Sequence, residues 1–215
     1  SDHDPVIVGL SFVAPIVDAG GPYSVVEGTS VALSATAQDA DGDANAITYA
    51  WDLDNNGSFE TAGQSVNFAP SASAPATLTV KVKATDAFGN SSTDEATVSV
   101  IYDFTGFFQP VDNAPVVNMV KAGQSIPVKF SLNGDQGLNI FAAGYPKFEF
   151  GICAASVVDS VETTTAGNSS LSYDLISDQY TYVWKTDKSW VGQCGNLIVK
   201  LNDGTTHTAL FRFTK

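Results

Sequence analysis

The feature that most constrains the fold of this chain is a period of two in its hydrophobic pattern. Leu78, Val80, Val82 and Ala84 alternate with threonine and lysine, so a strand here would have one apolar and one polar face. Such runs are short, and Gly, Pro, Asn or Asp interrupts them about every 8 to 12 residues, a spacing typical of β-sandwiches. Helical periodicity is nearly absent. The sequence therefore predicts an all-β protein.

Similar runs in both halves predict further strands. In the first half they are residues 31–35, 47–51 and 96–100, and Trp51 is expected to be the core tryptophan of a sandwich. In the second half they are residues 126–132, 180–184, 197–201 and 209–213, with a turn at Asn202-Asp203-Gly204 before the last of them. We therefore expect two tandem immunoglobulin-like β-sandwich domains.

Charge also divides the chain into two parts. Residues 1–101 hold 13 acidic residues against Lys81 and Lys83, whereas residues 102–215 hold 10 acidic and 8 basic residues. The acidic first part repels nucleic acid and anionic membrane surfaces, because binding to either needs basic patches. It favours calcium, which prefers carboxylate and carbonyl oxygen ligands. No apolar stretch reaches the roughly 18 residues of a membrane span, so membrane insertion is not expected.

The two cysteines, Cys153 and Cys194, lie in the second part, and neither belongs to a CxxC or CxxH motif. A lone pair this far apart indicates one disulfide in an exported protein more readily than a metal or redox site. The alternative is a pair of buried free thiols.

Residues 14–101 carry a series of motifs in a fixed order: Asp18-Ala19-Gly20-Gly21-Pro22-Tyr23, Glu27-Gly28, Asp39-Ala40-Asp41-Gly42-Asp43, Tyr49-Ala50-Trp51-Asp52 and Val82-Lys83-Ala84-Thr85-Asp86. This region resembles a PKD domain, which implies an immunoglobulin-like sandwich from an extracellular protein. It departs from the family after Trp51-Asp52, where a DxDxNG string replaces the usual turn. Residues 1–13 would then be an N-terminal strand or the tail of a preceding domain.

Residues 102–215 contain Pro127-Val128-Lys129-Phe130, Trp184-Lys185-Thr186-Asp187-Lys188 and Leu201-Asn202-Asp203-Gly204. They resemble the small bacterial PxKF domain, named for the first of these strings. The resemblance implies a non-catalytic domain that usually ends large secreted bacterial proteins. With the disulfide, we expect this region to be the second β-sandwich.

The DxDxNG string is one candidate calcium site. Asp52, Asp54, Asn56 and Gly57 occupy positions one, three, five and six of an EF-hand-like loop, where side-chain oxygens converge and glycine permits a sharp turn. The closing glutamate at position twelve is missing, although Glu60 at position nine could replace it. The alternative is a solvated turn whose Asp and Asn side chains bond their own backbone.

A second acidic loop contains Asp39, Asp41 and Asp43. Three alternating carboxylates repel one another at close range, so either a cation or separation into water must relieve them. Both interpretations, a bound calcium ion and carboxylates separated in water, stay open; calcium is the expected cofactor in the first.

Catalysis is not expected, because the histidines, His3 and His207, lack a nucleophile motif nearby. Among the aromatic residues, Trp190, expected at a turn, and Tyr145 are candidate ligand-binding platforms for a sugar or a protein. The alternative is that the aromatic residues pack within the core or between domains.

These observations favour a secreted or cell-surface accessory region, bacterial by resemblance, that spaces, anchors or mediates adhesion for a larger protein. Its partners would be neighbouring domains of that protein and a protein or polysaccharide surface. One alternative is a polysaccharide-binding appendage of a secreted hydrolase. Another is a subunit of a fibre or pilus, a homopolymer in which Val6-Ile7-Val8-Gly9-Leu10 inserts as a strand into a neighbour's sheet edge.

Overall fold

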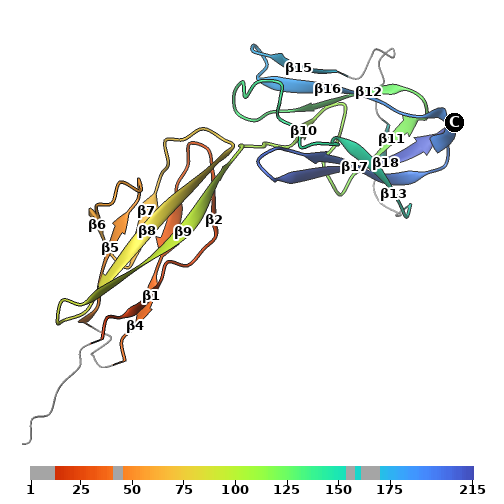
Figure 1. The fold of residues 1–215 in the computed structure, drawn as a ribbon. Helices are drawn as coiled ribbons and strands as arrows, with labels where there is room; N and C mark the ends of the chain where they lie inside the picture. The colour runs from red at the N-terminus through yellow and green to blue at the C-terminus, as the bar shows by residue number, and fades with distance from the viewer. Residues whose placement is uncertain (1–12, 41–45, 154–157, 161–169) are drawn as a thin grey trace, which may run out of the picture. The chain divides into compact units, whose positions relative to one another are not determined.

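The computed structural model describes residues 13–40, 46–153, 158–160 and 170–215. The chain forms two compact units, residues 1–100 and 101–215 (Figure 1). Strands dominate both units, and the prediction of an all-β chain with two tandem immunoglobulin-like sandwiches is confirmed. Within the described residues, no helix is long and apolar enough to cross a membrane.

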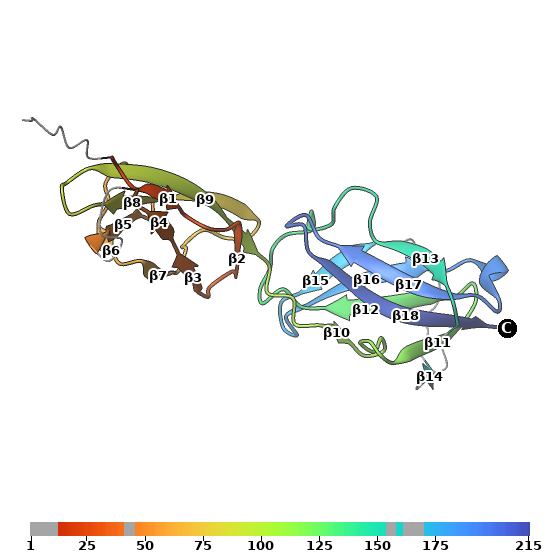
Figure 2. The ribbon, with the colours of Figure 1, turned by 90° about the horizontal axis from the view of Figure 1, so that it is seen from below.

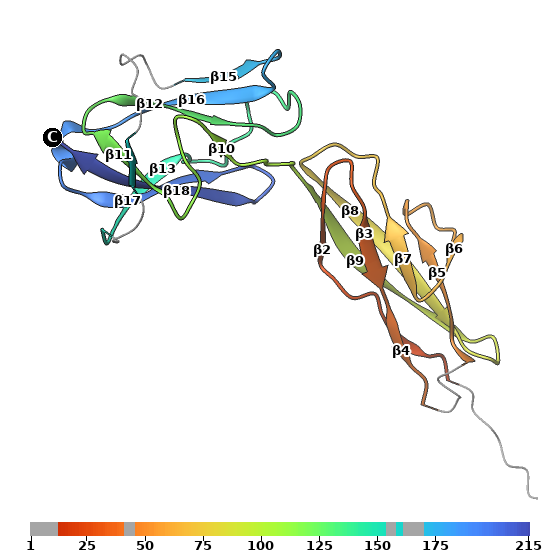
Figure 3. The same cartoon turned by 180° about the vertical axis from the view of Figure 1, so that it is seen from behind.

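The first unit is built from short strands around one longer hairpin. In chain order the strands are β1 (Ile16–Asp18), β2 (Tyr23–Val26), β3 (Val31–Ser34), β4 (Thr36–Gln38), β5 (Thr48–Asp52), β6 (Thr61–Ala62), β7 (Ser65–Phe68), β8 (Ala76–Thr85) and β9 (Ser91–Ile101). A five-stranded sheet has the order β2-β9-β8-β5-β6, and β3 pairs with β7 and β1 with β4. Figure 3 shows β3 and β7 side by side.

The core of the first unit follows the alternation in the sequence. Val80, Val82 and Ala84 of β8 are fully buried, while the lysines between them are partly exposed. Trp51 of β5 is also fully buried, and its Nε1 donates a hydrogen bond of 3.0 Å to the carbonyl oxygen of Gly63. This places the tryptophan in the core, as the sequence predicts.

The second unit is a sandwich of two larger sheets. Its elements are β10 (Phe107–Phe108), β11 (Val117–Lys121), β12 (Ser125–Phe130), β13 (Lys147–Gly151), β14 (Val158–Ser160), β15 (Leu171–Asp174), β16 (Gln179–Lys185), the 3-10 helix η2 (Lys188–Trp190), β17 (Cys194–Lys200) and β18 (Thr206–Thr214). The sheet orders are β10-β12-β16-β15 and β13-β17-β18-β11-β14. Strand β11 runs parallel to both of its neighbours, β18 and β14.

Aromatic side chains fill much of the second core. Phe130 and Tyr180 are fully buried with ring centroids 5.5 Å apart, and Trp184 packs edge-on against Phe211 at 5.0 Å. The ring of Phe148 lies over Gly195, where a Cβ atom would meet it at 2.6 Å. Glycine at position 195 therefore lets an aromatic ring approach the sheet.

Cys153 and Cys194 form a disulfide, as predicted. Cys194 is the first residue of β17, and Cys153 follows the end of β13, its neighbour in the sheet. The bond encloses a sequence separation of 41 residues. It thus holds the segment that leaves β13 against the sheet.

A partly buried polar network fastens the β15–β16 hairpin to the chain after β12. The Tyr173 hydroxyl donates to Asp178 Oδ1 at 2.6 Å, and the Ser131 hydroxyl donates to Asp178 Oδ2 at 2.9 Å. The hydrogen bond to the Asp178 carboxylate, followed by burial, raises the pKa of Tyr173 to about 12. Burial, helped by the charge of Asp135, raises the pKa of Tyr180 to about 12. Both tyrosines therefore stay protonated at neutral pH.

This network predicts alkaline lability of the second unit. Above pH 10.0, the ordinary tyrosine value, the unfolded chain releases these protons while the folded chain holds them until about pH 12. Linkage therefore lowers the free energy of unfolding as the pH rises through this window. Urea unfolding followed by circular dichroism should show a shallower decline with pH in Tyr173→Phe than in the natural chain. Equal pH slopes for the two proteins would contradict the role of Tyr173.

Candidate metal site

The first candidate calcium loop begins at the end of β5. Asp52, the last residue of this strand, is fully buried and lies opposite Lys81 of β8. The chain then turns sharply, with Asn55 at φ 56° and Gly57 at φ 95°. Left-handed backbone of this kind favours glycine and asparagine, which explains why the NNG sequence turns here.

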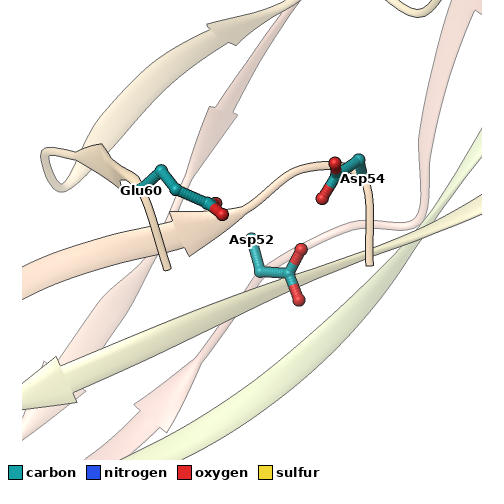
Figure 4. Close-up of side chains that lie close together, drawn as sticks. All are labelled: Asp52, Asp54 and Glu60. Atoms are coloured by element: carbon teal, nitrogen blue, oxygen red, sulfur yellow. The ribbon is translucent and has the colours of Figure 1, made fainter. Parts of the chain in front are cut away.

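This turn brings three carboxylates together. One oxygen each of Asp52, Asp54 and Glu60 lies within 4.8 Å of the others. Figure 4 shows the carboxyl groups of Asp54 and Glu60 directed toward one another, with that of Asp52 below them. The structure thus groups three of the residues that the sequence analysis assigned to this loop.

Asp52 also organises the backbone of the turn. Its two carboxylate oxygens accept hydrogen bonds from the amides of Asn56, at 3.1 Å, and Gly57, at 2.9 Å. Burial by itself would raise the pKa of Asp52, but these hydrogen bonds outweigh it and the pKa lies below its ordinary value. Asp52 is therefore a buried anion at neutral pH.

The side-chain amide of Asn56 lies between the other two carboxylates. Its Nδ2 donates to Asp54 Oδ2 at 2.9 Å and contacts Glu60 Oε1 at 3.4 Å, while its Oδ1 accepts from the Ser58 amide at 2.7 Å. The turn stabilised by hydrogen bonds from its own Asp and Asn side chains, which was the alternative to a calcium site, is therefore present together with the carboxylate cluster. To act as a ligand, Asn56 would have to rotate its amide and present Oδ1 to the ion.

Of the second acidic loop, only Asp39 falls among the described residues, because Asp41 and Asp43 lie outside them. A calcium site at Asp39, Asp41 and Asp43 stays a prediction. The tail at residues 1–13, with the exception of Val13, also lies outside the described residues.

The two candidate ligand-binding aromatics have different neighbours. Trp190, in η2, stacks on Phe148 with ring centroids 5.1 Å apart. Tyr145 lies beneath two ammonium groups, with Lys147 Nζ 5.0 Å and Lys200 Nζ 5.9 Å from its ring centroid. Because residues 147 and 148 point to opposite faces of β13, Trp190 and Tyr145 do not form a shared platform.

Two further ionisable residues, Asp86 and His207, contact neighbouring groups within the fold. Asp86 accepts hydrogen bonds from the amides of Phe88 and Asn90, each at 2.8 Å. Burial would raise the pKa of Asp86, but hydrogen bonds led by the Asn90 side chain lower it overall. The His207 ring stacks on Phe104 at 3.6 Å, and burial lowers the pKa of this histidine.

A groove that was not predicted from the sequence lies beside the metal loop. It has a volume of about 500 Å³ and is lined by residues 53–55, 68–72 and 77–79. The groove lies where β8 extends past the last residue of β5. Its walls come from three separate segments, so hydrophobic periodicity alone gave no signal for it.

Comparison with known proteins supports the assignment of the first unit. Residues 12–100 match the family model of the PKD domain. No curated protein matches the sequence. The PxKF resemblance of residues 102–215 stays a prediction.

Several solved tandem β-sandwich proteins are similar to the chain at low identity. The fibronectin(III)-like modules of CbhA from Clostridium thermocellum are 13% identical, with a TM-score of 0.38 over 93% of this chain and 94% of that one. The Ig1-2 module of the Drosophila receptor protein tyrosine phosphatase DLAR is 12% identical, with a TM-score of 0.31 over 94% and 98%. SGBP-B of Bacteroides ovatus, solved with a mixed-linkage heptasaccharide, is 14% identical, with a TM-score of 0.28 over 94% and 48%.

PKD and immunoglobulin-like domains are typically extracellular, non-catalytic modules, and the chain fits an accessory or adhesion-type module of this kind. The disulfide agrees with an oxidising compartment.

Proposed function

We propose that this chain is an extracellular spacer or adhesion region whose first unit is stiffened by one calcium ion. The observation that carries the proposal is the cluster of Asp52, Asp54 and Glu60 carboxylate oxygens within 4.8 Å of one another. Asn56 Oδ1 would be a fourth ligand after rotation of its amide. Calcium is the preferred cation, because these side chains offer oxygen ligands and calcium accepts them in flexible geometry.

A calcium ion bound at this loop would stabilise the β5–β6 edge of the five-stranded sheet in the first unit. Asp52 ends β5, and Glu60 immediately precedes β6, its edge neighbour. An ion held by both residues would therefore close the loop at residues 53–59 and hold the two strand ends together. The strong negative charge of residues 1–101 favours uptake of a cation. A stiffened first unit suits a role in spacing neighbouring domains or presenting an adhesive surface.

Polysaccharide binding and fibre assembly are the alternatives. An aromatic sugar platform would use Trp190 and Tyr145, but these residues lie on opposite sides of β13 and share no contact among those described. Strand exchange in a fibre would use residues 6–10, which lie outside the described residues. The carboxylate cluster therefore favours the calcium-stiffened module.

Calcium should raise the melting temperature of the first unit by several degrees, and EDTA should reverse the change. A ligand at a hundred times its dissociation constant adds about 2.7 kcal/mol to the stability of the state that binds it. Titration calorimetry should show a heat of calcium binding in the natural chain, and this heat should be lost in Asp54→Asn and Glu60→Gln. Both substitutions keep the side-chain shape and remove one charge.

The matched control is Glu95→Gln, which removes one exposed carboxylate from β9 in the same unit. It should bind calcium like the natural chain. The proposal fails if the natural chain shows neither heat nor thermal shift. It also fails if Glu95→Gln loses as much binding as Glu60→Gln, since the effect would then come from net charge.

A further inference from the structure

Strand β13 forms one edge of the five-stranded sheet in the second unit. It pairs with β17 on one side, from Lys147 opposite Ile198 to Gly151 opposite Cys194 (Figure 2). On its other side, no strand in the described part of the chain pairs with it. Such an edge presents unpaired backbone N–H and C=O groups that can accept another strand.

The C-terminal end of this edge is apolar. Phe150 of β13 is 59% exposed, Ile152 just beyond the strand is 96% exposed, and Val191 after η2 is 41% exposed. Phe150 also contacts Trp190 edge-on at 5.7 Å. Natural sheets usually protect their edges with charge, proline or a covering segment, whereas this end of β13 leaves apolar side chains in water.

The charged residues of β13 are complementary to those of an antiparallel β13 strand from a second copy of the chain. Lys147 and Glu149 lie two residues apart on one face of the strand, and their Nζ and Oε1 atoms are 2.5 Å apart. Their side chains are 42% and 52% exposed. If two β13 strands paired antiparallel about Phe148, each Lys147 would face Glu149 of the second copy.

The same charges disfavour the neighbouring registers. A shift that centres the pair on Glu149 places the two glutamates opposite each other, and a shift that centres it on Lys147 does the same for the lysines. Like charges directly opposite destabilise a strand pair, whereas opposite charges stabilise it. Among these antiparallel pairings, the charge pattern therefore favours the register centred on Phe148.

We propose that two copies of this chain associate through β13, as an antiparallel strand pair centred on Phe148. The contact is isologous, so a two-fold axis relates the copies and the assembly closes as a dimer. Phe148 and Phe150 of both copies then lie on one continuous face of the joined sheet, where each Phe150 gains apolar contact. The proposal does not depend on calcium, because the metal loop belongs to the first unit.

Sedimentation velocity of the full chain over a wide range of concentration, in EDTA, tests this proposal. The mass should rise from the 22.5 kDa of one chain toward twice that value. Lys147→Glu and Glu149→Lys should each weaken self-association by about tenfold, because either change places like charges opposite each other at both symmetry-related positions. The double variant, Lys147→Glu with Glu149→Lys, should restore association to the natural level.

Lys185→Glu is the matched control, because it reverses an exposed charge on β16 in the other sheet. It should associate like the natural chain. A mass of one chain at every concentration would overturn the proposal. So would single variants that associate as tightly as the natural chain, or a double variant as weak as the singles. Unchanged melting temperatures of the charge variants at low concentration would show that all of them fold.

Discussion

Replacing both Cys153 and Cys194 with serine should lower the free energy of unfolding of the second unit by about 4 kcal/mol, by the chain-entropy relation for the loop that the bond closes. The bond spans 41 residues, including β14, β15, β16 and η2. Without it, the unfolded chain gains the conformations that loop closure forbids, while the folded sheet keeps its hydrogen bonds. The loss should appear as a separate, earlier transition of the second unit.

Urea unfolding followed by tryptophan fluorescence measures this effect, with Trp51 reporting the first unit and Trp184 and Trp190 the second. The natural chain treated with a reductant should move to the same midpoint as the double serine variant, since both lack the same bond. The first unit contains no cysteine, so its transition should not move in either sample. Equal midpoints for the natural chain and the double variant would contradict a stabilising disulfide.

The strands of both units were predictable from the sequence because a period of two fixes which side chains face a core. Val80, Val82 and Ala84 are buried as the alternation requires, and Ala209, Phe211 and Phe213 repeat this in the last strand. The disulfide was predictable because only two cysteines exist. These features depend on local pattern or on simple pairing.

Strand partners and side-chain details were not predictable in the same way. The period of two does not specify which strands pair, so neither the parallel pairing of β11 with β18 nor the edge position of β13 had a signal in the sequence. At the metal loop, the sequence spacing predicted that Asp52, Asp54 and Glu60 share one loop. It did not predict that the side-chain nitrogen of Asn56 lies between two carboxylates. That placement depends on the backbone of the turn.

Trp51→Ala should destabilise the first unit by about 3 to 5 kcal/mol, the usual cost of removing a buried aromatic side chain. Trp51 is fully buried, and its Nε1 bonds the Gly63 carbonyl at 3.0 Å, so the variant creates a cavity and leaves an acceptor without its partner. A domain has only about 5 to 15 kcal/mol of stability in total. We therefore expect a large part of the first unit to unfold near body temperature.

The control is Trp51→Phe, which keeps most of the ring but loses the hydrogen bond, at a cost of about 1 kcal/mol for the bond itself. Circular dichroism should show the first unit melting early in Trp51→Ala and slightly early in Trp51→Phe. Of the three tryptophans, Trp184 and Trp190 then remain, so fluorescence follows the second unit alone and should show no shift. Equal losses in the two variants would show that the hydrogen bond, and not the packing of the ring, holds this part of the sheet.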